Sequence, residues 1–361
     1  MKPIKIGTME ILPAALAVTL LLGCIGGAVG YALKLPLGML LGSLVAVGGT
    51  ALLGLRPLGQ PIHMPQPLRM AFVPIIGLGI GGAFTPQIFA HMAGWTPSLI
   101  ALCAFVPMSH FLVYRIYRLG KLDAVTAYYG TVPGGLVESV ALGEGAGADA
   151  SVLVLIQFLR LIITIVTVPI AFLFITGHSV GSAAGVAMEG ASNPLGPLDV
   201  LILTIAGVGG YWVGRKLRFP APIMTGPLLA SALVHLTGLT DAIPPGWTIG
   251  MTQIVVGTGL GARFAGMSRA TLRRGAGLAL IGTLASLTLA AGFAEVLHLA
   301  VGLPITAVFL AFAPGGVTEM SLIALSLEVS VVFVTMHHVI RIVLSVSIAR
   351  LFAHRVQREK T

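Results

Sequence analysis

Long apolar stretches, separated by short polar or basic segments, follow one another along the whole chain. About 20 residues of helix are needed to cross roughly 30 Å of hydrocarbon, and ten stretches come near that length. We expect membrane helices at residues 11–31, 36–55, 70–90, 96–117, 151–176, 198–214, 221–240, 249–265, 275–301 and 328–351. Two more apolar segments, 123–146 and 303–326, contain Pro-Gly-Gly, which interrupts helical hydrogen bonding. The pattern predicts an all-α integral membrane protein.

Composition agrees with this pattern. Of the residues, 56% are hydrophobic and 9% are charged, whereas soluble domains carry about 25% charged residues. The net charge of +9 comes from Lys and Arg in short clusters between apolar segments. Such clusters are typical of membrane topology signals and not of a nucleic-acid surface. The expected partner is therefore the lipid bilayer, and no nucleic acid is expected.

The chain contains an internal repeat. The sequence PGGLVE at 133–138 recurs as PGGVTE at 314–319, and at the same spacing Arg160 corresponds to Arg341. The segments 77–84 and 257–264 share a Gly-x-Gly-x-Gly-x-x-Phe pattern, and the surroundings of Pro36 and Gly42 resemble those of Pro220 and Gly226. Three matches in the same order indicate a tandem duplication. We predict one repeat half at 1–178, a linker at 179–197 and a second half at 198–361.

The basic clusters help to choose between two topologies. If each Pro-Gly-Gly segment spans the membrane, each half crosses six times and the repeats are parallel; if it enters and returns, each half crosses five times and the repeats are inverted. With a cytoplasmic N-terminus and re-entrant segments, all of the following face the cytoplasm: Lys2, Lys5, Arg56, Arg69, Arg115, Arg118, Lys121, Arg215, Lys216, Arg218, Arg263, Arg269, Arg273, Arg274, Arg350, Arg355, Arg358 and Lys360.

The parallel arrangement would place the clusters at 215–218 and 263–274 on the wrong side. We therefore expect two inverted repeats, each of about five transmembrane helices plus a re-entrant or broken Pro-Gly-Gly helix, with both termini cytoplasmic. Paired broken helices of this kind form the substrate sites of many secondary transporters. The alternative is that each Pro-Gly-Gly only kinks a full span.

Four charged residues of the apolar segments occupy equivalent positions in the two halves. Arg160 and Arg341 are in membrane helices, where an unpaired Arg costs about 2.5 to 3.5 kcal/mol. Glu138 and Glu319 follow the two Pro-Gly-Gly motifs by one turn. Two hypotheses stay open. The Glu and Arg residues form structural ion pairs, or the Arg side chains and the helix N-termini bind an anionic ligand.

The two halves differ at one polar position. Gln157 of the first half corresponds to His338 of the second, and His337 precedes it. A titratable imidazole could relay protons, or it could be a hydrogen-bonded core residue. Neighbouring residues point to different helix faces, so these two histidines alone do not form a metal site. Cys24 and Cys103 lie in apolar segments and predict neither a disulfide framework nor a metal site.

The doubled motif, with Gln157-x-x-Arg160 in the first half and His338-x-x-Arg341 in the second, resembles the bacterial AbrB-duplication membrane family. The resemblance covers essentially the whole chain and implies a multi-pass protein of the bacterial inner membrane. Members are labelled either as ammonia monooxygenases or as regulators. The residues do not support the monooxygenase label, because copper or iron oxygen chemistry needs clustered His or carboxylate ligands.

The sequence thus predicts a transporter-like protein that moves a small solute, with a small organic anion ranked first, through a site at mid-membrane between inverted repeats. The alternative is a ligand-binding membrane regulator that acts indirectly on gene expression. We expect no enzyme activity, no catalytic residues, no metal and no cofactor. Whether the protein forms a homo-oligomer stays an open question. The predicted substrate-binding residues are Pro133, Gly134, Gly135, Glu138, Arg160, Pro314, Gly315, Gly316, Glu319, His338 and Arg341.

Overall fold

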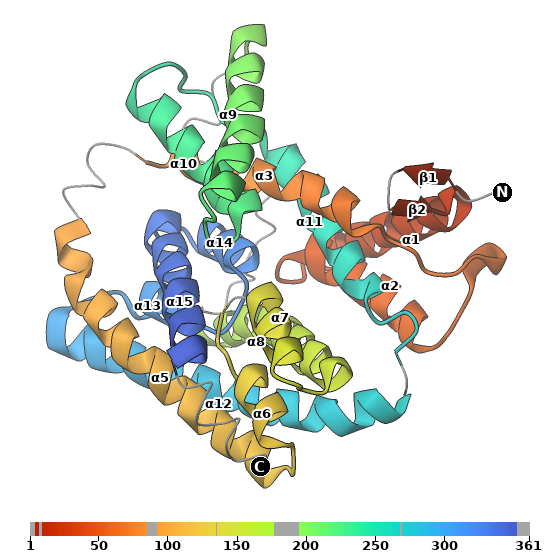
Figure 1. The fold of residues 1–361 in the computed structure, drawn as a ribbon. Coiled ribbons are helices and arrows are strands. Elements are labelled where there is room, and N and C mark those ends of the chain that lie inside the picture. Colours follow the sequence, from red (N-terminus) through yellow and green to blue (C-terminus); the bar gives the residue numbers. More distant parts are fainter. Residues whose placement is uncertain are drawn as a thin grey trace. The chain divides into compact units, whose positions relative to one another are not determined.

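The computed structural model of this chain describes residues 4–6, 9–84, 92–134, 136–176, 195–267 and 269–351. Within these ranges the regular structure is helical except for one short antiparallel ladder near the N-terminus (Figure 1). The ladder consists of β1 (Ile4–Ile6) and β2 (Met9–Ile11), with Ile4 opposite Ile11. The prediction of an all-α protein is confirmed apart from this ladder.

The helices of the two halves follow the same order. Those of the first half are α1 (Pro13–Ala32), α2 (Gly38–Leu52), α3 (Gln66–Gly82), α5 (Thr96–Leu119), α6 (Ala124–Gly130), α7 (Leu136–Gly145) and α8 (Ala150–Thr176), with 3-10 turns η1 (Pro57–Gly59) and η2 (Ala93–Trp95). Those of the second half are α9 (Pro197–Lys216), α10 (Pro222–Leu236), α11 (Gly246–Ala262), α12 (Arg269–Val301), α13 (Ile305–Phe312), α14 (Val317–Ser326) and α15 (Val331–Leu351). Each predicted helix is present within a few residues of its expected position, except that α3 ends at Gly82 instead of 90 and α12 begins at Arg269 instead of 275.

Six helices of the described residues are long and apolar enough to cross a bilayer: Pro13–Ala32, Ala93–Leu119, Ala150–Phe174, Pro197–Lys216, Gly275–Val301 and Val331–Leu351. The other four predicted spans, α2, α3, α10 and α11, have 15 or 17 residues. Their length corresponds to about 22 to 26 Å of helix. The chain is thus a membrane-type helical protein, and the ten-span topology stays a prediction.

The helices gather into two compact units that do not coincide with the repeat halves. Unit 1 comprises Met1–Thr85, Val168–Met267 and Leu325–Leu327, and unit 2 comprises Pro86–Thr167, Ser268–Ala324 and Glu328–Thr361. Unit 1 therefore takes α1 to α3 from one half and α9 to α11 from the other. Unit 2 takes the two long helices α5 and α12, both Pro-Gly-Gly segments, and α15 together with most of α8. Equivalent elements of both halves are thus interleaved in each unit.

Unit 1 is held together by glycine contacts that occur twice. Gly42 of α2 lies against the backbone of Gly26 in α1, and Gly226 of α10 lies in the same way against Gly210 in α9. The helices α2 and α10 also begin alike, since Leu37 and Ala221 before them have positive φ angles of 47° and 48°. This shared geometry supports the third and weakest of the repeat matches.

The glycine triplets join the two halves inside unit 1. Gly77 and Gly81 of α3 face α10, and Gly257 and Gly261 of α11 face α2. The spacing of two residues suggests that such glycines do not share a helix face, but the outer pair of each triplet is four residues apart and does share one. Both helices remain regular, so the triplets serve close packing and not local unwinding.

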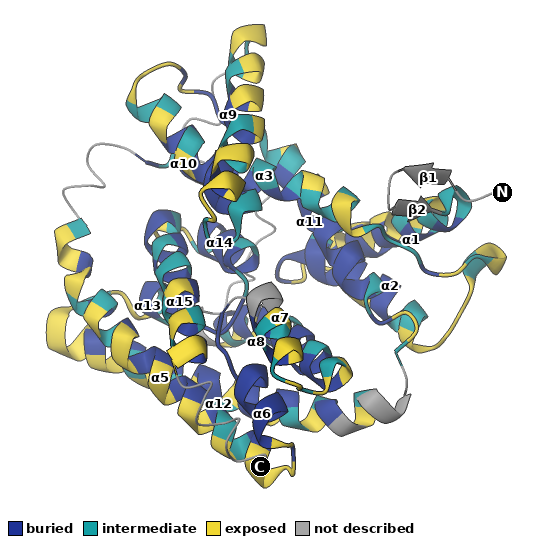
Figure 2. Ribbon diagram, in the orientation of Figure 1, coloured by how far each residue is buried: buried dark blue, intermediate teal, exposed yellow. Residues whose placement is uncertain are grey.

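Exposed residues run along several long helices (Figure 2), and many of them are large and apolar. Examples are Leu21 of α1, Phe111 of α5, Ile205 of α9 and Leu299 of α12, each more than half exposed. In water such surfaces would aggregate, whereas in a bilayer they contact lipid chains. The exposed faces therefore agree with a membrane location.

Candidate functional site

The second Pro-Gly-Gly segment breaks a helix in a way that frees backbone carbonyls. Helix α13 ends at Phe312, and α14 begins at Val317 after the buried residues Pro314 and Gly315. Proline has no N–H, so the carbonyl four residues before it, that of Leu310, loses its helical donor. His338 of α15 replaces this donor, because its Nε2 donates to Leu310 O at 2.9 Å.

The first segment repeats this arrangement with a different side chain. Helix α6 ends at Gly130 and α7 begins at Leu136, with Pro133 and Gly134 buried between them. The carbonyl four residues before Pro133 is that of Tyr129, and Nε2 of Gln157 donates to it at 2.8 Å. Gln157 and His338, at equivalent positions of the two halves, thus both donate to the carbonyl four residues before the proline. Gly135 lies outside the described residues.

The two buried arginines bind the carbonyls at the breaks themselves. Arg341 donates through Nη1 to Ala313 O and through Nη2 to Gly315 O, the latter at 2.7 Å. Arg160 donates through Nη1 to Val132 O. In both halves a guanidinium therefore lies at the C-terminal end of a broken helix, where a positive charge interacts favourably with the negative end of the helix dipole.

Glu319 lies at the opposite end of the second break. It is buried in the first turn of α14, with its carboxylate against Gly316, so it offsets the positive end of that helix. The described hydrogen bonds of Arg341 all go to backbone carbonyls, so an ion pair with Glu319 is not what positions its guanidinium. The side chain of Glu138, the equivalent residue, lies outside the described residues.

The first segment folds back on itself as a hairpin. The backbone N–H of Asp149, after α7, donates to the Thr126 hydroxyl in α6 at 2.8 Å. Gly143 of α7 also lies against Tyr129 of α6. Asp149 then caps α8 by accepting from the N–H of Val152 at 3.1 Å. The entry and exit of this segment are therefore adjacent, as in a segment that enters the membrane and returns.

The two halves meet at these breaks within unit 2. Gly134 is close to Ile342 and to the Ser345 hydroxyl in α15, and Tyr128 of α6 donates to Ile348 O at 2.9 Å. Arg160 donates to the carbonyl of Val132, two residues before Gly134, and Gly134 lies against Ile342, the residue after Arg341. The region between the breaks thus contains two buried cations.

Several buried polar atoms around the breaks have no hydrogen-bond partner in the described part of the chain. They are Ser139 Oγ, Ser345 Oγ, Gln157 Oε1, His338 Nδ1, Arg160 Nε and Arg341 Nε. Buried polar atoms are normally paired, and exceptions cluster at functional sites. We therefore take the two breaks, α8 and α15 as the candidate binding site. Ser139 and Ser345 are not among the site residues predicted from the sequence. Their burial beside the breaks identifies them as candidates.

His337 lies on another side of α15 from His338. Its Nδ1 donates to Phe333 O at 2.8 Å, and its Nε2 lies 2.8 Å from the Ser98 hydroxyl in α5. The equivalent residue in the first half is Ile156, which has no polar atom beyond its backbone. His337 is therefore a hydrogen-bonded core histidine, which matches one of the two roles considered for it.

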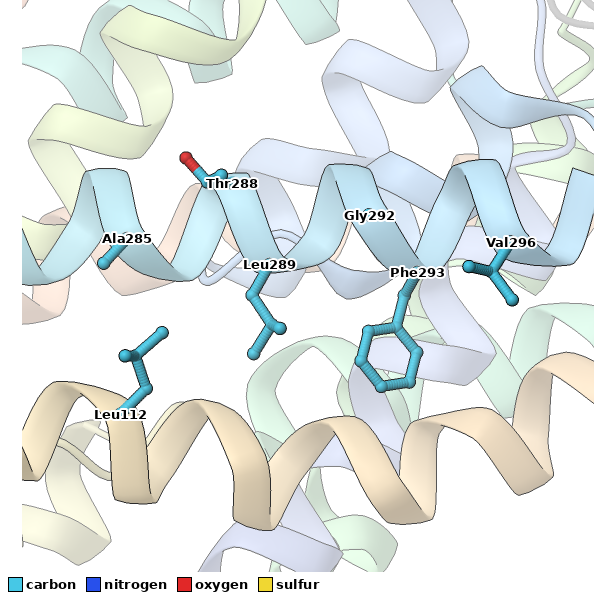
Figure 3. A pocket seen from close by; sticks show the side chains of 7 residues that line it. All are labelled: Leu112, Ala285, Thr288, Leu289, Gly292, Phe293 and Val296. Atoms are coloured by element: carbon cyan, nitrogen blue, oxygen red, sulfur yellow. The ribbon is translucent and has the colours of Figure 1, made fainter.

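A groove of about 620 Å³ also lies on unit 2 (Figure 3). It runs between α5 and α12, lined by Leu112, Ala285, Thr288, Leu289, Gly292, Phe293 and Val296. The single hydroxyl, that of Thr288, donates to the Leu284 carbonyl of its own helix. The groove offers apolar surface only, as expected of a lipid-facing crevice.

Comparison with known proteins places the chain in a family. Residues 48–357 match the family described as "Transition state regulatory protein AbrB". The chain belongs to this AbrB family. It is 26% identical over 309 residues to "Uncharacterized protein YhjN" of Bacillus subtilis (strain 168), covering 79% of this chain and 78% of that protein. It is also 26% identical over 295 residues to "Putative regulator AbrB" of Escherichia coli (strain K12), covering 81% of this chain and 82% of that protein.

Proposed function

We propose that this AbrB-family protein is a secondary transporter that moves a small anion, a small organic anion first, across the bacterial inner membrane. The observation that carries the proposal is the pair of buried arginines at the two helix breaks. Their hydrogen bonds go to neutral carbonyls, which leave the positive charges in place. Two buried cations in one region of the protein repel, and an anion between them would remove that cost.

The surrounding groups fit this role. The N-terminal end of α7 carries a partial positive charge and favours anions, whereas Glu319 already offsets that of α14. The hydroxyls of Ser139 and Ser345 are buried without partners among the described residues and can donate hydrogen bonds. An anion held by Arg160, Arg341 and these hydroxyls would use groups from both halves of the chain.

The arrangement of the units bears on how alternating access would occur. A motion of one repeat half against the other would disrupt unit 2, because both halves are interleaved in it. The proposed site lies wholly within unit 2. We therefore propose that alternating access moves unit 2 as one body together with its bound anion.

The topology proposed for this mechanism is ten spans and two re-entrant segments in inverted repeats, with cytoplasmic termini. The hydrogen bond between Asp149 and Thr126 supports the return of the first segment. Cysteine labelling in a variant without Cys24 and Cys103 would test it. A cysteine at Ser182 should react with an impermeant reagent from the periplasm, and reaction from the cytoplasm alone would refute the inverted arrangement.

A regulator without transport activity is the second candidate. The name of the Escherichia coli relative, "Putative regulator AbrB", favours it. In that case the same anion site would report the presence of a ligand to a partner protein. Neither proposal includes an enzymatic reaction.

The test is a thermal-shift screen of the full-length protein against sulfate, nitrate, chloride, small carboxylates, amino acids and ammonium. A compound at a hundredfold excess over its Kd should stabilise the protein by about 2.7 kcal/mol. The variants Arg160→Gln and Arg341→Gln should lose that shift, whereas Arg56→Gln, an exposed arginine, should keep it. A shift that persists in both buried variants would show that the arginines are structural only. Uptake of the active compound by proteoliposomes then separates a transporter from a regulator.

A further inference from the structure

In each half, one side chain donates a hydrogen bond to the carbonyl that proline leaves without a helical donor. The two side chains differ in one chemical property. Gln157 and His338 each donate one N–H to that carbonyl. The remaining polar atom of each side chain, Gln157 Oε1 and His338 Nδ1, is buried and has no partner in the described ranges. An amide oxygen takes no proton near neutral pH, whereas an imidazole nitrogen does. The fold thus repeats this position and makes it titratable in the second half.

We infer that His338 is a proton-binding site that couples proton movement to the anion. The inference rests on the proposed transport function. Nε2 already carries the hydrogen donated to Leu310, so the incoming proton binds the lone pair of Nδ1. The neutral imidazole becomes an imidazolium, and no other bond forms or breaks.

The surrounding charges make the two ligands cooperative. Arg341 lies three residues after His338 on α15, where the two side chains are neighbours, so its positive charge repels a proton at His338. An anion bound at Arg341 would cancel this repulsion. Proton binding would in turn strengthen anion binding by the same factor, because coupling between two sites is reciprocal.

Two further histidines lie on α15 or on α5, which packs against it. His110 of α5 is buried beside the first break, with its Nε2 3.4 Å from the Thr131 hydroxyl and its ring against Tyr128. It does not contact the carbonyl of Leu310, to which His338 donates. His337, on the same helix as His338, is held by Phe333 O and Ser98 of α5.

Helix α13 supplies only the Leu310 carbonyl, because it has no titratable residue. The acidic residues on the neighbouring elements are Glu319 of α14, at the far end of the break, and Glu138 and Glu144 of α7, of which Glu138 has its side chain outside the described residues.

The same geometry disfavours a metal cation as the coupling ion. Backbone carbonyls at helix breaks are the usual ligands of such ions in transporters. Here the carbonyls of Val132, Ala313 and Gly315 already accept from guanidinium groups. Arginine side chains therefore occupy the position that a metal cation would take. This leaves the proton as the coupling ion.

The halves supply the matched variant for a test. The variant His338→Gln carries at position 338 the same side chain that donates to the equivalent carbonyl in the first half. We therefore expect this variant to fold. Sulfate and nitrate, whose charges are constant near neutral pH, are the probes for thermal shifts of the full-length protein in phosphatidylethanolamine–phosphatidylglycerol nanodiscs. In the parent, their apparent affinity should rise by about tenfold for each unit by which pH falls over the range where one proton is taken up.

In His338→Gln this pH dependence should vanish, and in His298→Gln, which removes an exposed histidine of α12, it should remain. A pH dependence that survives His338→Gln, or that is absent from the parent, would overturn the inference. If neither anion shifts the parent at any pH, the anion site proposed above fails, and 15N spectra of labelled histidine decide the proton site alone. A His338 signal that titrates supports it, and one that stays neutral at acidic pH refutes it.

Discussion

Units 1 and 2 are assembled from equivalent helices of the two halves, but they are stabilised by different groups. In unit 1 unbroken helices touch through glycine backbones, as at Gly42 and Gly226, with no side chain between them. In unit 2 broken helices are stabilised by side chains, as at Arg341 and His338. The first kind of contact permits close packing and little chemistry, because it exposes no polar group. The second places polar groups deep within the protein, so binding chemistry is expected there.

The largest effect expected is from a side chain placed between the helices of unit 1. Gly42→Leu or Gly226→Leu would meet the backbone of the opposite glycine, and we expect a loss of about 3 kcal/mol or more of stability. Yield and apparent Tm in detergent measure it. Gly49→Leu is the control, since a Cβ at Gly49 of α2 meets nothing within 4 Å. Equal losses at Gly42 and Gly49 would contradict the backbone contact.

The second effect comes from removing a guanidinium in unit 2. Arg341→Met leaves three buried carbonyls without their donor, and we expect a loss of about 2 to 3 kcal/mol. Arg350→Met removes an exposed arginine of the same helix and should change apparent Tm little. An Arg341 variant as stable as the parent would show that the break does not depend on this residue.

A smaller effect tests the pairing of proline and imidazole. His338→Ala leaves Leu310 O without a donor, at a cost of about 1 to 2 kcal/mol. Pro314→Ala restores an N–H that can bond to the same carbonyl, so His338→Ala should cost less in that background. A double-mutant cycle measured by thermal unfolding should give a coupling of about 1 kcal/mol. Strictly additive losses of stability would show that the two residues are not energetically coupled.

The smallest effect is expected in the groove of unit 2. Thr288→Val removes a hydroxyl that bonds only within its own helix, so stability should change by less than about 0.5 kcal/mol. Anion-induced shifts should also be unchanged. A loss of anion binding in this variant would move the candidate site from the helix breaks to the groove.

The candidate site could be located from the sequence only in part. Pro314 and Arg341 were predictable, because proline breaks a helix and a buried arginine needs partners. The partners themselves were not. One of the two hypotheses from the sequence paired Arg341 with Glu319. In the structure the hydrogen bonds of Arg341 go to backbone carbonyls, whose exposure depends on where the helix ends. Ser139 and Ser345 carry no sequence signal, since isolated serines are common in membrane helices.

Apolar stretches, glycine spacing and the repeated Pro-Gly-Gly motif determined the helices, the breaks and the duplication, because these depend on residues close together in the sequence. The pairing of Gln157 with Tyr129 and of His338 with Leu310 was decided by tertiary structure. So was the division into two units that each contain both halves. Both depend on which helices pack side by side, and that is set by surfaces brought together only when the whole chain folds.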